Sequence, residues 1–242
     1  MPTLEETLKR LATTFTVRDI MIQGAGLKCA DDELQAAGVS HSNPDFNVIP
    51  IRRNGSLTGY FERDSRKANN IELIDLVSDG TSLLDLVEIL EDRPFCFVLS
   101  HQQIEGYVHY SDLNHHLMKL AFYVMLEALE RVALDSIEGK DDRESLKRDL
   151  DPGRFEQIES SYKRTGDAAR SLVSYLNIAD LLRLAAKTGS VHVEEGVVKA
   201  MKDVRDDASH ASSNLVSSYA DVTKLAYVKR ECLRVIGAAQ QS

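Results

Sequence analysis

The chain has 242 residues, of which 43% are hydrophobic and 28% are charged, and its formal net charge is −9. This length is enough for one large domain or two small ones. The acidic balance argues against non-specific binding to the phosphate backbone of DNA, which needs clustered cations. The three cysteines lie far apart and form no Cys-x-x-Cys pair, so we expect small core residues in a reducing compartment.

Residues 1–15 predict a lead-in helix. Leu4, Leu8 and Leu11 are spaced for one helical face within residues 3–14. The segment is amphipathic and charged, which is not typical of a signal peptide. No apolar run in the chain approaches the roughly 18 residues of a membrane span. We therefore expect a cytoplasmic protein with no membrane partner.

Residues 16–70 predict a first α/β repeat. Asp31–Asp32 are expected to cap a short helix that ends at Gly38. Apolar stretches within residues 46–61 flank Asn54-Gly55, and both of these residues tolerate positive φ. This part of the chain therefore predicts a β-hairpin.

Residues 71–115 predict a second repeat with the same order of elements. A short strand at 74–77 precedes Thr81, which we expect to cap a buried helix at 83–90. A second hairpin is predicted at 95–108.

The two hairpins carry the same Gly-Tyr pair, as Gly59-Tyr60 and as Gly106-Tyr107, 47 residues apart. Such a repeat predicts two copies of one supersecondary element that pack on each other. The space between two such copies is a natural place for a ligand.

Residues 116–242 predict an all-α bundle, with no strand after Asp112. The chain is therefore expected to be an α+β protein, with small sheets and helices followed by a helical bundle. Helical patterns are expected at 113–137, 155–162, 172–186, 193–210 and 214–236, and Asp149–Gly153 is expected to break the first from the second.

The first half resembles a tandem pair of CBS domains, the nucleotide-sensing Bateman module. The resemblance is carried by the stretch Asn47–Tyr60 and by Ile104–Leu113, which ends in Ser-Asp-Leu. It covers about residues 16–115. It implies a cleft that binds adenine-type nucleotides as regulatory ligands, with no metal and no resident cofactor.

The resemblance implies four ligand-binding residues: Tyr107, His109, Asp112 and Asp64. Asp112 stands where the family has a carboxylate that accepts from the ribose hydroxyls. The interval from glycine to aspartate is one residue shorter in the first repeat, so we favour the site at Asp112 over that at Asp64. The alternative is that both aspartates only cap the helices that follow them.

The second half resembles a HEPN domain, an all-α dimeric fold whose members carry an Arg-x4–6-His motif. Arg205 and His210 match this motif, and Asp206 stands where the family has asparagine. The resemblance implies a homodimer and a metal-independent endoribonuclease. His210 would then transfer protons, Arg205 would bind the scissile phosphate of RNA, and Asp206 or Ser209 would orient His210.

Two readings of the whole chain remain open. In the first, the CBS pair senses an adenine-type nucleotide and controls a dimeric endoribonuclease. In the second, the helical half is a non-catalytic interaction or scaffold module. The acidic residues around the motif, including Asp203 and Asp207, repel RNA and offer partners to Arg205, and they favour the second reading.

Overall fold

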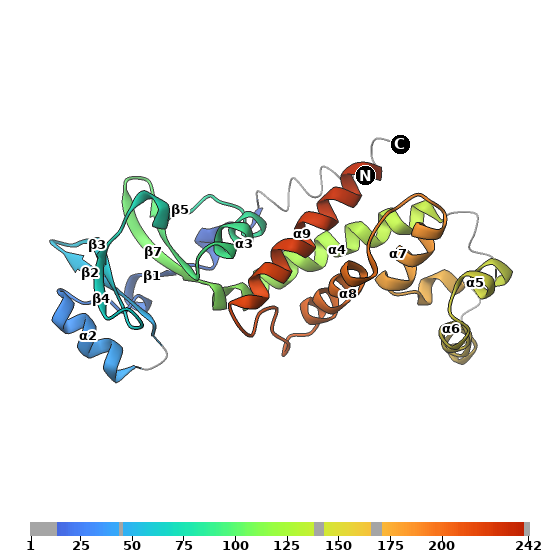
Figure 1. Cartoon of the computed structure of the whole chain (residues 1–242), viewed down its shortest axis with the longest axis horizontal. Helices are drawn as coiled ribbons and strands as arrows, with labels where there is room; N and C mark the ends of the chain where they lie inside the picture. Colours follow the sequence, from blue (N-terminus) through green and yellow to red (C-terminus); the bar gives the residue numbers. More distant parts are fainter. Residues whose placement is uncertain (1–13, 44–45, 138–142, 166–170, 240–242) are drawn as a thin grey trace. The chain divides into compact units, whose positions relative to one another are not determined.

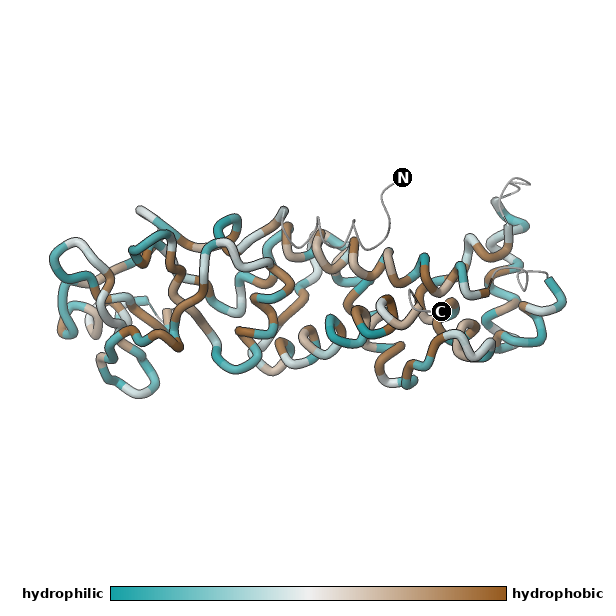
Figure 2. The backbone as a smooth tube through the Cα atoms, turned by 90° about the horizontal axis from the view of Figure 1, so that it is seen from above, coloured by the Kyte–Doolittle hydropathy of each residue, from teal (hydrophilic) through white to brown (hydrophobic). Residues whose placement is uncertain are grey.

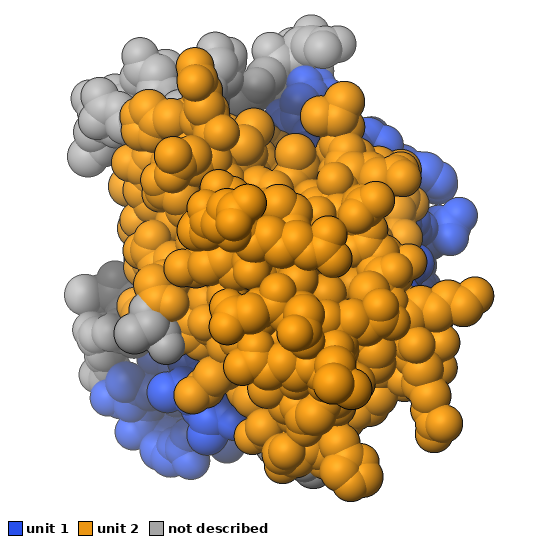
Figure 3. All heavy atoms as spheres, turned by 90° about the vertical axis from the view of Figure 1, so that its left-hand side faces the viewer, with its two compact units in different colours: residues 1–11, 118–242 blue, residues 12–117 orange. Residues whose placement is uncertain are grey.

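The computed structural model describes residues 14–43, 46–137, 143–165 and 171–239. The chain forms two compact units. We call them the α/β unit, described from residue 14 to Leu117 and orange in Figure 3, and the helical unit, described from Met118 onward. The predicted lead-in helix lies outside the described residues except for its last residue, Thr14.

The α/β unit contains seven strands and two α-helices among its described residues, joined by short 3-10 turns. They are η1 (Val17–Asp19), β1 (Ile22–Gln23), η2 (Gly24–Gly26), α2 (Glu33–Ser42), β2 (Val48–Arg53), β3 (Ser56–Glu62), β4 (Lys67–Asn70), η3 (Leu73–Asp75), β5 (Leu76–Ser78), α3 (Leu83–Glu91), β6 (Phe95–Ser100), β7 (Gln103–His109) and η4 (Tyr110–Asn114). The strands form two sheets, with orders β2-β3-β4 and β1-β7-β6-β5.

Both predicted hairpins are confirmed, as β2–β3 and β6–β7 (Figure 1). Asn54 and Gly55 adopt φ angles of 51° and 84°, the left-handed values that a tight two-residue turn requires. His101 holds the matching place in the second hairpin, with a φ of 55°. The turn chemistry therefore sets the ends of the strands in both repeats.

The two hairpins share one register, shifted by 47 residues. Ile51 pairs with Gly59 in the first, and Val98 pairs with Gly106 in the second. The ladder slips by one residue directly after Ile51 and directly after Val98, so even the irregularity is duplicated. The sequence repeat is therefore a repeat of backbone hydrogen bonding.

Each sheet takes its outer strand from the other repeat. In the first repeat, β3 pairs with β4 through Gly59 and Asn70. We count β4 with the second repeat because its Asn69 and Asn70 lie 47 residues after the two residues of β1, which moves the start of that repeat from the predicted residue 71 to Lys67. In the second repeat, β7 pairs with β1, from the start of the first, through Gly106 and Gln23. Gln23 and Asn70 are themselves 47 residues apart. The exchange of strands is therefore reciprocal.

The glycine of each Gly-Tyr pair lies against the exchanged strand. A Cβ atom on Gly59 would lie 2.6 Å from the carbonyl oxygen of Asn69. A Cβ atom on Gly106 would lie 2.7 Å from the sulfur of Met21 and 3.2 Å from the carbonyl oxygen of Ile22. The backbone contact leaves no room for a Cβ atom at Gly59, so glycine is needed there for the backbones to approach. At Gly106 the backbone contact is tight, and the Met21 side chain would have to move to admit a Cβ atom.

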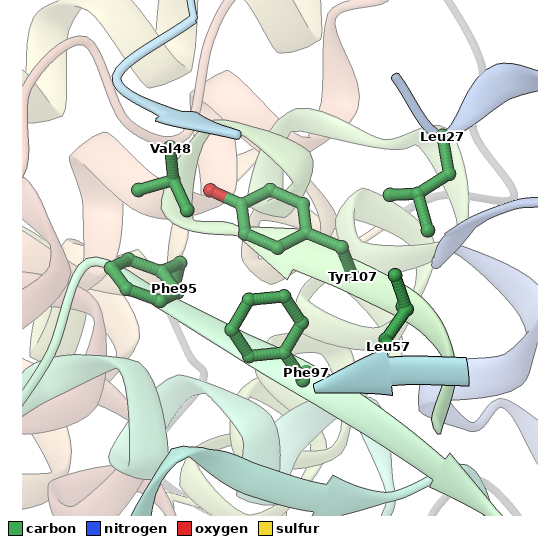
Figure 4. Packing of buried hydrophobic residues seen from close by; sticks show 6 residues of the cluster. All are labelled: Leu27, Val48, Leu57, Phe95, Phe97 and Tyr107. Carbon is green, nitrogen blue, oxygen red and sulfur yellow. The ribbon is translucent and has the colours of Figure 1, made fainter. Parts of the chain in front are cut away.

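The tyrosine of each pair joins a core that both repeats share. The rings of Tyr60 and Tyr107 lie 5.3 to 5.7 Å, between centroids, from the rings of Phe95 and Phe97. Figure 4 shows Tyr107 and Phe97 in this cluster together with aliphatic side chains from the first repeat, including Leu57. The predicted packing of the two copies on each other is confirmed. Aromatic side chains occupy the contact between the copies, which is where the repeat predicted a ligand.

In the α/β unit, two helix boundaries and one strand differ from the prediction. Asp32 caps α2 by accepting from the backbone N–H of Gln35 at 2.8 Å, but the helix continues through Gly38 to Ser42. The guanidinium of Arg63 donates to carbonyl oxygens of Ser40 and Asn43 and so satisfies this later end.

The cap of α3 is Ser82 and not Thr81, because the Ser82 hydroxyl accepts from the N–H of Asp85 at 3.1 Å. The turn after β3 leads into β4 and not into a helix.

The helical unit contains α4 (His116–Ser136, which begins two residues before the unit), α5 (Arg143–Asp149), α6 (Pro152–Thr165), η5 (Leu172–Tyr175), α7 (Ile178–Lys187), α8 (Glu195–Ser209) and α9 (Ala220–Ala239). Hydrophobic segments recur along these helices, as along the strands (brown in Figure 2). No strand follows Asp112 within the described residues, as predicted. Asp151 accepts from the N–H of Arg154 and so caps the start of α6. This cap lies within Asp149–Gly153, where the break between helices was predicted.

The described helices include none that is both long and apolar enough to cross a membrane.

Replacing Gly59 with alanine should destabilise the α/β unit by about 1–3 kcal/mol, because the new methyl group overlaps the Asn69 carbonyl of the exchanged strand. Gly106→Ala should destabilise it less, because the Met21 side chain can move away from the new methyl group. Gly38→Ala is the matched control. Gly38 is exposed on α2, and a Cβ there would meet nothing within 4 Å, so this change should stabilise by about 0.5–1 kcal/mol. Urea unfolding of the three variants measures both effects, and equal stabilities at all three positions would contradict the role of the glycines.

Candidate functional sites

Three of the four predicted ligand-binding residues come together where β7 ends and η4 begins. Tyr107 and His109 are on β7, and Asp112 is on η4. The Asp112 carboxylate accepts from the backbone N–H of His109 at 2.8 Å, and the His109 ring lies 2.8 Å from the Ser111 hydroxyl. Asp112 thus closes the turn η4 from within and does not cap α4, the helix that follows it, while its second oxygen remains an acceptor.

Aromatic rings border this turn. The His109 ring is stacked with Tyr107 at a centroid distance of 6.4 Å and lies 4.2 Å from the Tyr110 ring. Planar rings next to a carboxylate offer stacking and a hydrogen-bond acceptor together, which is the chemistry that a nucleoside needs. We call Tyr107, His109, Tyr110 and Asp112 the β7–η4 cluster.

Burial controls the charges in the β7–η4 cluster. It raises the pKa of Asp112 above its ordinary value, although the bond from the His109 N–H lowers it in part. It lowers the pKa of His109, so this imidazole is held neutral over a wider pH range. The Tyr107 pKa is raised, mostly by burial and further by Asp112. The cluster therefore holds one carboxylate, whose charged form lowers the stability of the folded state, among neutral groups.

Asp64 does not join the β7–η4 cluster. It is exposed in the turn between β3 and β4, in the other sheet. No helix follows it, so it does not cap one either. The shorter interval from Gly59 to Asp64 therefore reflects a hairpin turn that replaces the helix-like turn of the second repeat.

In the helical unit, Arg205 lies near the end of α8 and binds side chains of α4. Its Nε donates to Glu130 at 3.1 Å, and its guanidinium carbon lies 5.3 Å from the centre of the Tyr123 ring. Burial raises the pKa of Glu130, and the Arg205 charge opposes this rise. Arg205 thus has a carboxylate partner, but it is none of the neighbouring aspartates that the sequence suggested.

Asp206 and His210 have separate surroundings. The Asp206 carboxylate accepts from Lys202 at 2.7 Å. His210 is exposed and follows the last residue of α8, and its backbone N–H donates to the carbonyl oxygen of Asp207. Among the described residues, no hydrogen bond joins the His210 imidazole to Asp206 or Arg205. The motif therefore spans the end of the penultimate helix and does not begin the last one.

A buried lysine that the sequence analysis missed holds the segment after α8. Lys119 is only 8% exposed, and its ammonium lies 3.1 Å from the carbonyl oxygens of both His210 and Ala211. It also donates to the carbonyl oxygen of Ser213. A cation at this end of a helix is favoured by the helix dipole. Lys119 therefore fixes the backbone that carries the exposed His210.

The pocket that Glu130 lines is acidic. It has a volume of about 610 Å3, and its charged side chains are Glu127, Glu130 and Arg131. Two carboxylates against one guanidinium do not suit a phosphate diester. The surroundings of Arg205 are therefore less favourable for RNA than the motif alone suggests.

The described residues hold no cluster of three or more histidine, cysteine, aspartate or glutamate side chains that could bind a metal ion. Comparison of the chain with family models, with curated proteins and with solved structures finds no match. The contacts above are therefore the basis for the functional proposals that follow.

Asp112→Asn keeps an acceptor for the His109 N–H but removes the buried charge. The folded-state pKa of Asp112 is raised, so its carboxylate lowers stability once the pH exceeds the ordinary value of 3.8. We expect the variant to gain stability over the wild type as the pH rises from 3 to 7. Urea unfolding across this range gives the difference, and a difference that does not vary with pH would contradict the buried charge.

Proposed function

We propose that this chain is a nucleotide-responsive regulatory protein, in which the α/β unit binds an adenine-type nucleotide and the helical unit gives the output. The observation that carries the proposal is the retention of the Asp112 carboxylate, at a cost in stability, beside the rings of the β7–η4 cluster. A half-buried carboxylate that accepts from one backbone N–H suits a ligand that donates more hydrogen bonds.

The ribose of a nucleoside supplies such donors. Two vicinal hydroxyls would donate to Asp112, and the base would stack on the rings of His109 or Tyr110. The ligand is expected to bind at one site and not at two, because Asp64 lies in an exposed hairpin turn and not in the β7–η4 cluster.

For the output we favour a non-catalytic role, in which the helical unit binds a second copy of the chain or another protein. The ion pair between Arg205 and Glu130 supports this choice, because it uses the guanidinium that would otherwise bind a phosphate. The binding signal would pass through α4, whose first residues belong to the α/β unit and whose remainder carries Tyr123 and Glu130.

The second candidate is a metal-independent endoribonuclease, and one observation favours it. His210 is exposed, and Lys119 donates to the carbonyl oxygens of His210, Ala211 and Ser213, so the backbone that carries the imidazole is held in place. This exposed imidazole could transfer protons near neutral pH, in a homodimer that brings two motifs together.

Thermal unfolding with ATP, ADP, AMP and adenosine tests the sensor. At about 100 times its dissociation constant, the true ligand should raise the unfolding temperature of the wild type by about 5–10 °C. Asp112→Asn should reduce this shift because the amide has only one acceptor oxygen. Asp64→Asn is the matched control and should leave the shift unchanged. The sensor proposal fails if no nucleoside or nucleotide shifts the wild type.

Incubation of the purified protein with RNA, in the presence of a chelator, decides between the non-catalytic role and the endoribonuclease. The non-catalytic role predicts no cleavage by the wild type, with or without nucleotide. The endoribonuclease predicts cleavage that His210→Ala abolishes and that Glu130→Gln increases, because this change releases Arg205 from its carboxylate. Cleavage that survives both His210→Ala and Arg205→Ala would come from a contaminant.

A further inference from the structure

The α/β unit has a pocket that the proposed nucleotide site does not use. It has a volume of about 780 Å3 and lies between α2 and the end of β3. Its apolar lining comes from Leu34, Ala37 and Phe61. Leu34 is 84% exposed, an unusual position for a leucine on a helix that packs on a sheet. The apolar surface of this pocket is therefore available to a partner.

The rim of the pocket is basic, although the chain as a whole is acidic. His41, Arg63 and Arg66 line it, with Glu33 as its one acidic residue. Arg63 is used to close the end of α2. Arg66 stands in the turn after β3 with a φ of 53°, and no hydrogen bond or ion pair of its side chain is seen within the described part of the chain. Arg66 is thus available for an anionic partner.

The same unit carries a protruding turn with the complementary character. Leu73 and Ile74, on η3, are 89% and 64% exposed. Glu72 and Asp75 flank them. The turn is held in shape because Asp75 accepts from the N–H of Glu72 at 2.9 Å and returns its own N–H to the Glu72 carbonyl at 3.0 Å. Two aliphatic side chains between two carboxylates are therefore presented in a fixed conformation.

We propose that the Glu72–Asp75 turn of one copy of this chain inserts into the α2–β3 pocket of a second copy. Leu73 and Ile74 would cover Leu34 and Phe61, and Glu72 would approach Arg66. Both surfaces are on the α/β unit, so a two-fold axis would form the contact twice, once in each direction. This contact is separate from any dimer of the helical unit and does not depend on the proposed nucleotide.

The chemistry of the pocket favours this occupant over a small anion. A free phosphate would pair with Arg66 but would leave the apolar lining in water. The Glu72–Asp75 turn supplies apolar groups and negative charge together, and it is present at the same concentration as the pocket.

Disulfide trapping tests the contact in the full chain. In a Cys29→Ala background, in which the remaining cysteines Cys96 and Cys232 are buried, a Leu34→Cys chain is mixed with a differently tagged Leu73→Cys chain. Mild oxidation should join the two tags. Leu34→Cys mixed with Ser56→Cys, an exposed position on the tip of the first hairpin, is the control. Equal rates for the two mixtures would overturn the proposal.

Sedimentation equilibrium of the full chain measures the strength of its self-association. Leu73→Ser should weaken self-association by about ten- to one-hundred-fold, the cost of losing one buried aliphatic side chain. Arg66→Glu should weaken it by about five- to ten-fold, and adding Glu72→Arg should restore it because the charges are then reversed. A chain that is monomeric at all concentrations, or one whose association ignores these changes, would overturn the contact.

Discussion

The approach of an exchanged strand to a bare glycine backbone, made once in each repeat, is the constraint on which the α/β unit depends. A Cβ atom would overlap the exchanged strand at Gly59 and would crowd it at Gly106, and in this way strands that begin one repeat complete the sheet of the other. The pairing also sets the direction of the next side chain, because successive residues of a strand face opposite sides. Tyr60 and Tyr107 consequently meet the two phenylalanines of β6 in a single core.

Much of this fold could be predicted from the sequence, because short-range chemistry determines it. Asn54-Gly55 marked one hairpin, the Gly-Tyr pairs marked the duplication, and Asp32 marked the start of α2. The exchanged strands could not be predicted. Lys67–Asn70 is polar and has little intrinsic preference for a strand, and it becomes one only because β3 offers it a free edge. The end of α2 was misplaced for a similar reason, since a side chain 20 residues away satisfies it.

The candidate sites were predictable in part. Tyr107, His109 and Asp112 come together because they are close in sequence across one turn, and Asp64 lies apart from them because its repeat turns differently. In the helical unit the motif revealed neither the partner of Arg205 nor the role of Lys119, since both contacts join segments that are far apart in the sequence. One signal for Lys119 was present. It lies three residues before Phe122 and seven before Leu126, which places a lysine on the buried face of α4.

The reciprocal exchange has a consequence for the order in which the molecule can be made. β1 lies near the start of the α/β unit, yet its partner β7 closes the unit more than 80 residues later, in the pairing of Ile22 with Tyr107. During synthesis β1 therefore has no edge to join until the whole second repeat has left the ribosome. Contacts of such long sequence separation slow folding, whereas the helices that follow form from local contacts. Both repeats must consequently mature together, as one folding event and not as two.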